Sequence, residues 1–115
     1  MIKKFNVQFL EEAAEFIDNL EEKVREKVIY NIRKAQIIND QEIFKKLKDE
    51  IWEFRTLYNK THFRLFAFWD RAKKTDTVVI STHGLIKKRN KIPLKDIETA
   101  EKLRRIYFEQ KNIKK

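Results

Sequence analysis

The hydrophobic positions in the first third of the chain predict a short strand followed by helical segments. Residues 3–8 form the predicted strand. Apolar residues then recur every three or four positions over residues 10–19 and again over residues 20–38, with mostly charged residues between them. This is the spacing of helices that bury one face. The two segments are expected to form either an αα-hairpin or one bent helix.

Residues 42–48 interrupt the helical pattern. Asn39 and Asp40 supply a polar stop, and the segment that follows carries the apolar pair Phe44 and Leu47 among charged residues. A polar stretch between periodic segments is typical of a loop. The pattern therefore predicts a loop with a short turn over residues 42–48.

From Ile51 onward the period of the pattern changes to two. Apolar and polar side chains alternate and aromatic residues are frequent, which is typical of β-strands. Three strands are predicted, from Ile51 to Tyr58, from His62 to Trp69 and from Thr77 to His83. A tight turn at residues 59–60 joins the first two, and a polar loop over residues 70–76 joins the next two. Sequential strands with short links predict an antiparallel meander.

An amphipathic helix is the last predicted element. Gly84 is expected to interrupt the third strand, and Pro93 fits the first turn of a helix. The apolar stripe of that helix comprises Ile97, Ala100, Leu103 and Tyr107. The order is strand, two helices, three strands, helix, which defines an α+β fold. A chain of 115 residues has room for one domain, over residues 1–115.

The positive charge of the chain is concentrated near its C-terminal end. Residues 1–80 carry 16 basic and 14 acidic side chains, whereas residues 81–115 carry 11 and 4. Within the second range, the segment from His83 to Pro93 contains four cations and no acidic residue. Because these cations leave the end of a predicted strand, we expect a rigidly held basic patch, which suits binding of a polyanion.

The composition excludes several kinds of chemistry. The chain has no cysteine, so it forms no disulfide or thiolate metal site, which suits a reducing cytoplasm. Two histidines are too few for a histidine-rich metal centre, and one glycine cannot form a nucleotide-binding loop. We therefore expect no metal and no cofactor. No signal peptide and no apolar run of roughly 18 residues is visible, so a cytoplasmic protein that does not cross a membrane is expected.

Three segments of the chain resemble a known family. They are IWEFR at residues 51–55, FRLFAFW at residues 63–69 and HGLIKKRNKIPLKDIETAEKLRR at residues 83–105. In these segments the chain resembles the RelE/ParE superfamily of bacterial type II toxins, and within it the HigB-like, phage-derived branch. The resemblance implies a RelE-like fold and an enzyme that cuts messenger RNA in the ribosomal A site. It also implies a co-expressed antitoxin, in this branch often a helix-turn-helix DNA-binding protein.

Four residues are candidates for the chemistry of such an endoribonuclease. Metal-free RNA cleavage uses the ribose 2′-hydroxyl as nucleophile, and it needs a proton acceptor, a proton donor and cations on the phosphate. We expect Arg64 to stabilise the phosphate charge, and Lys87 and Lys88 to contact the phosphate or transfer protons. Crowding of like charges favours the neutral form of each lysine. His83 is the other candidate for proton transfer, because an imidazole changes charge near neutral pH.

Three further cations are expected to position the RNA. They are Arg55, Arg89 and Lys91. Arg55 stands on the strand next to that of Arg64, and a hairpin turn at residues 59–61 would place the two arginines opposite each other. In a purely structural alternative, Arg64 pairs with Glu53 across the strands. The alternative for His83 is a strand-end histidine bonded to backbone, and the aromatic residues of the strands are expected to form the core.

Two other functions remain open from the sequence. The first is a non-enzymatic, gyrase-inhibiting toxin of the ParE kind, because this activity shares the same fold. The second is a plain nucleic-acid-binding module, which would bind RNA or DNA in a salt-sensitive way without cutting it. A supercoiling assay would distinguish the first alternative from an endonuclease, and the absence of cleavage with or without ribosomes would distinguish the second.

Overall fold

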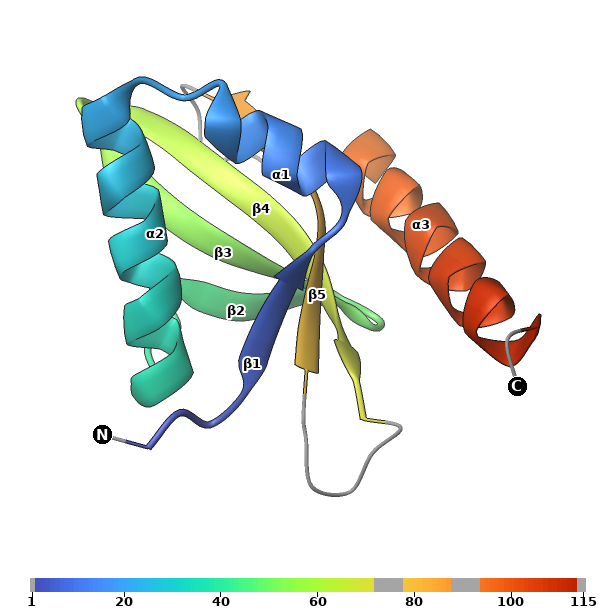
Figure 1. The fold of residues 1–115 in the computed structure, drawn as a ribbon. Helices are drawn as coiled ribbons and strands as arrows, with labels where there is room; N and C mark the ends of the chain where they lie inside the picture. The colour runs from blue at the N-terminus through green and yellow to red at the C-terminus, as the bar shows by residue number, and fades with distance from the viewer. Residues whose placement is uncertain (1, 72–77, 88–93, 114–115) are drawn as a thin grey trace.

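A computed structural model describes residues 2–71, 78–87 and 94–113 of the chain. These residues form one five-stranded sheet and three helices (Figure 1). The elements in chain order are β1 (Asn6–Phe9), α1 (Glu11–Asp18), α2 (Glu22–Ile37), β2 (Phe44–Lys48), β3 (Ile51–Tyr58), β4 (Thr61–Asp70), β5 (Val78–Lys87) and α3 (Leu94–Ile113). The predicted α+β fold is confirmed, with its N-terminal strand, two helices, antiparallel meander and C-terminal helix.

The strands follow the order β1-β5-β4-β3-β2 across the sheet. From β2 to β5 each strand is antiparallel to the next, as a meander requires. β1 lies parallel to β5 at one edge. From β1 the chain passes through the two helices to β2 at the opposite edge and returns along the meander to β5. This long connection is what a parallel pair needs.

Helices cover both faces of this sheet (Figure 1). On one face, α1 packs mainly on β5 and α2 on β3. They are separate helices against different strands, rather than an αα-hairpin or one bent helix. On the other face, Ile97 and Ala100 of α3 are buried against Phe66, Phe68 and neighbouring apolar residues. Because alternate residues of β4 point to opposite faces, its apolar run fills both cores, and this explains why that run is nearly continuous.

The loop predicted over residues 42–48 is wrong, because residues 44–48 form the edge strand β2. A turn precedes this strand, closed by bonds from the amides of Ile43 and Phe44 to the carbonyl of Asp40. Phe44 is buried on the face of α2, whereas Leu47 packs into the core on the face of α3. The pairing with β3 also shifts between Lys46 and Lys48. A strand that buries one residue on each face leaves no period-two pattern, which is why the sequence predicts a loop.

The prediction that Gly84 interrupts the third strand is also wrong. β5 continues through this position to Lys87, and Gly84 pairs with Leu65 of β4. A Cβ atom at Gly84 would lie 2.2 Å from the Phe16 ring of α1. Gly84 therefore lets the helix approach the sheet closely rather than ending the strand.

The far end of α3 is fixed to the sheet by Asp70, the last residue of β4. The Tyr107 hydroxyl donates a 2.7 Å hydrogen bond to Oδ2 of this buried carboxylate, and the Lys111 ammonium contacts the same oxygen. Burial, followed by the bond to Asp70, raises the pKa of Tyr107. Its hydroxyl therefore stays a donor at neutral pH. No helix among the described residues is long and apolar enough to span a membrane.

Candidate nucleic-acid interface

The register of the meander arranges side chains in rows across the face that α3 partly covers. Residues directly opposite each other on antiparallel strands share a face, as do residues two apart along a strand. In the order β3, β4, β5, the rows are Leu57, His62 and Lys87; Arg55, Arg64 and Leu85; and Glu53, Phe66 and His83. The sheet therefore brings candidate residues from three strands to one face.

The hairpin between β3 and β4 confirms that Arg55 and Arg64 lie opposite each other. Asn59 and Lys60 form its turn and both have positive φ angles, of 48° and 62°. Two successive left-handed residues are the mark of a two-residue hairpin turn whose twist matches that of the strands. This turn fixes the register of the pair, so the two guanidinium groups start from neighbouring positions on one face.

A buried carboxylate lies between these arginines. Glu53 is 0% exposed, with its Oε1 3.2 Å from Nε of Arg55 and its Oε2 3.5 Å from Nη1 of Arg64. The pairing of Arg64 with Glu53, left open by the sequence, is thus confirmed. The two arginine side chains differ in exposure, at 2% for Arg64 and 21% for Arg55. A ligand that approaches this face reaches Arg55 first.

Burial raises the pKa of Glu53, because it disfavours the charged carboxylate. The positive charges of Arg64, Arg55 and Lys45 oppose this effect, in that order of size. Lys45 belongs to β2, where it pairs directly with Glu53. The carboxylate is thus held by cations from three strands.

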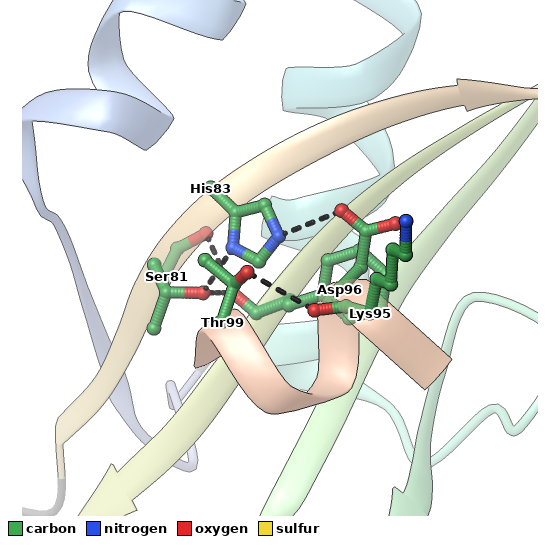
Figure 2. A network of polar contacts seen from close by, with 7 residues as sticks. Ser81, His83, Lys95, Asp96 and Thr99 are labelled. Carbon is green, nitrogen blue, oxygen red and sulfur yellow. Dashed lines mark hydrogen bonds and ion pairs between the residues drawn. The ribbon is translucent and has the colours of Figure 1, made fainter. Parts of the chain in front are cut away.

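His83 joins β5 to the first turn of α3 (Figure 2). Its Nε2 lies 3.1 Å from Oδ1 of Asp96, and its Nδ1 lies 2.9 Å from the hydroxyl oxygen of Thr82. The ring stacks on Phe66, with centroids 4.9 Å apart. At 13% exposed, it is bonded to side chains rather than to backbone. His83 therefore orients the start of the helix beside the basic face, and it also presents a carboxylate-supported imidazole there.

His62 is a candidate that the sequence reasoning missed. It lies directly opposite Lys87, the last residue of β5, and both are partly buried. The two-residue turn gives the pairing of β3 with β4, but a shift in register between Phe66 and Ala67 hides the pairing of β4 with β5. This bulge places Thr82 outside the regular ladder, where its hydroxyl donates to the Phe66 carbonyl. Only with that extra residue counted do His62 and Lys87 meet.

Three predicted site residues lie outside the described residues. They are Lys88, Arg89 and Lys91. Pro93 and most of the polar loop predicted over residues 70–76 lie outside them as well. Within the part of the chain that is described, no three histidine, aspartate or glutamate side chains form a group that could hold a metal ion.

The fold and this face define a small α+β protein with cations gathered on one partly covered face of a sheet. The model of the family described as Phage derived protein Gp49-like (DUF891) matches residues 15–105. The chain therefore belongs to this family of phage-derived, toxin-like proteins. No curated protein matches the chain.

Proposed function

We propose that this protein is the toxin of a type II toxin–antitoxin system in the HigB-like branch of the RelE/ParE superfamily. Its activity would be ribosome-dependent cleavage of messenger RNA. The observation that supports this proposal is the sheet register, which gathers Arg55, Arg64, His62 and Lys87 on one face beside the start of α3. Such a group combines cations for a phosphate with imidazoles for proton transfer.

In the proposed reaction the ribose 2′-hydroxyl loses its proton and attacks the adjacent phosphorus. The bond from phosphorus to the 5′-oxygen breaks, and that oxygen takes up a proton, so the products are a 2′,3′-cyclic phosphate and a 5′-hydroxyl. Arg55 and Lys87 contact the phosphate, and Arg64 stabilises its charge from beneath the surface. His62, His83 and Lys88 are the candidates for proton transfer. Arg89 and Lys91 position the RNA.

The proposed system includes a co-expressed antitoxin, for which a helix-turn-helix DNA-binding protein is the expected type. The chain carries a formal net charge of +9, so an acidic partner would be attracted to it electrostatically. An acidic small reading frame beside the gene would support this partner. The second expected partner is the substrate itself, messenger RNA bound to the ribosome.

The test is the fate of a defined message in a translating extract. Wild-type protein is expected to cut the message when ribosomes are present. The double variant Arg55→Gln, Lys87→Gln is expected to cut it at least about 100-fold more slowly, because two cations that stabilise the phosphate are lost. Primer extension along the message measures both the positions and the rates of cleavage.

A matched double variant, Lys102→Gln with Arg105→Gln, removes the same two charges from exposed positions of α3. It is expected to cut at the wild-type rate. Intact messages with the wild-type protein would overturn the proposal. If the same preparation instead inhibited supercoiling by gyrase, the ParE-like alternative would replace it, and salt-sensitive binding without cleavage would favour the plain binding module.

A further inference from the structure

Two arginines that face each other on one side of a sheet repel, and Arg64 is in addition almost fully buried. Like charges directly opposite on neighbouring strands destabilise the pair, and a buried cation needs a partner. Glu53 lies within 3.5 Å of both guanidinium groups. With the carboxylate ionised, these three side chains together carry a net charge of +1, a sign that attracts an anion such as a phosphate.

The two arginines have different access to such an anion. One fifth of the Arg55 side chain is exposed, whereas Arg64 lies beneath the surface. A guanidinium is a planar fork that binds phosphate through parallel N–H groups. A carboxylate beside Nε restrains the orientation of that fork through the ion pair, although the contact does not have hydrogen-bond geometry. Glu53 contacts Arg55 at this nitrogen.

We propose that Glu53 is a positioning residue of the RNA-binding face, whose buried carboxylate orients the Arg55 guanidinium toward an RNA phosphate. Arg64 is the buried counter-charge that keeps this carboxylate in place. The inference rests on the proposed function, because it takes RNA as the ligand of the face. It adds an acidic residue to a site that is otherwise recognised by its cations.

The test measures binding of a short single-stranded RNA with 2′-O-methyl riboses, which cannot be cut by 2′-hydroxyl attack, using fluorescence anisotropy. The Glu53→Gln variant keeps the size of the side chain and removes its charge. We expect it to bind at least about tenfold more weakly, the factor that corresponds to one charge-assisted hydrogen bond. A simple charge effect has the opposite sign, because removal of an acidic group strengthens binding to a polyanion.

Asp70 provides the matched control. It is also a buried carboxylate with a cationic partner, Lys111, but it lies at the opposite end of β4 from Arg64. Asp70→Asn therefore removes a similar buried charge away from the RNA-binding face. We expect it to bind RNA as tightly as wild type or slightly more tightly. Loss of binding by both variants to the same degree would overturn the inference, since it would reflect damage to the fold.

A second arm uses Arg55→Gln and does not depend on the folding of the Glu53 variant. As pH falls through the raised pKa of Glu53, the carboxylate is neutralised and Arg55 is released. The affinity of the wild type for RNA is therefore expected to fall as the pH is lowered through this range. The affinity of Arg55→Gln, which lacks the guanidinium, is not expected to fall. The other titratable groups are the same in both proteins, so the difference between the two curves isolates the effect of Glu53 on Arg55.

The other charged groups on the elements packed around Glu53 are common to both proteins in this comparison. They are Lys45 on β2, Arg64 on β4 and His83 on β5, and the partly buried Asp96, Glu101 and Arg104 of α3, the helix on this face of the sheet. If the RNA affinity of the wild type and that of Arg55→Gln change equally as the pH falls, the inference is overturned. Absence of message cleavage by the wild-type protein would overturn only the proposed function, because the binding measurement involves no cleavage.

Discussion

Replacing Lys87, Lys88 and Lys91 together by glutamine is expected to weaken RNA binding roughly 50-fold and to abolish message cleavage. Each cation that neutralises a phosphate of single-stranded RNA releases about 0.7 counterion, which at physiological salt corresponds to about a fourfold gain in affinity. Three such contacts multiply to the expected factor. Cleavage suffers more than binding where Lys87 or Lys88 also transfers a proton. Anisotropy with the 2′-O-methyl RNA and primer extension on a translated message measure the two effects.

The control for this variant removes three lysines from α2, namely Lys23, Lys27 and Lys34. The net charge changes by the same amount, but these side chains lie on a helix that packs on the opposite face of the sheet. Binding and cleavage are expected to stay within about twofold of wild type, because these lysines lie away from the RNA-binding face and their charges are screened by salt. Equal losses in the two triple variants would mean that the charge acts in bulk, and the localised site would be abandoned.

Elements that bury one face, or run through the centre of the sheet, could be predicted from the sequence. The segments that became α1, α2 and β3 have clear apolar periods, and β4 is a nearly continuous apolar run, as expected of a central strand. β2 could not be predicted, because Phe44 and Leu47 are buried on opposite faces and leave no repeat. Gly84 was misinterpreted for a different reason. Its neighbour Phe16 comes from α1, and a contact between residues so far apart in sequence leaves no local signal.

The part of the candidate site whose strand register is set by a turn could be predicted from the sequence. A two-residue turn places Arg55 opposite Arg64, and this follows from sequence alone. The position of His62 opposite Lys87 depends on the bulge at Thr82. No residue type in the sequence indicates this bulge, so the pairing could not be predicted. Glu53 has the typical polar place in a period-two strand, so its complete burial depends on packing of α3 over the sheet. The cations of the site could thus be identified from the sequence, whereas the buried carboxylate of Glu53 and the position of His62 among them were found only in the structure.

Gly84→Ala is expected to destabilise the protein by about 1 to 3 kcal/mol, the usual cost of forcing an extra methyl group into a packed core. In an ordinary strand position the same change stabilises, since alanine loses less conformational entropy on folding. Here the new Cβ would lie 2.2 Å from the Phe16 ring, so α1 must shift away from β5. Urea denaturation, followed by circular dichroism, measures the change in the free energy of unfolding.

The double variant Phe16→Leu, Gly84→Ala separates this clash from a general effect of alanine in β5. Leucine lacks the flat ring that meets the new methyl group, so the effects of the two changes on stability are expected to be coupled. The double variant should be about 1 kcal/mol more stable than the sum of the two single losses indicates. Additive losses would contradict the close approach of α1 to β5. β5 also carries His83 and Lys87, so message cleavage by the Gly84→Ala variant tests whether the basic face depends on α1. Unchanged cleavage would show that this face depends on the sheet and α3, and not on the helices of the opposite face.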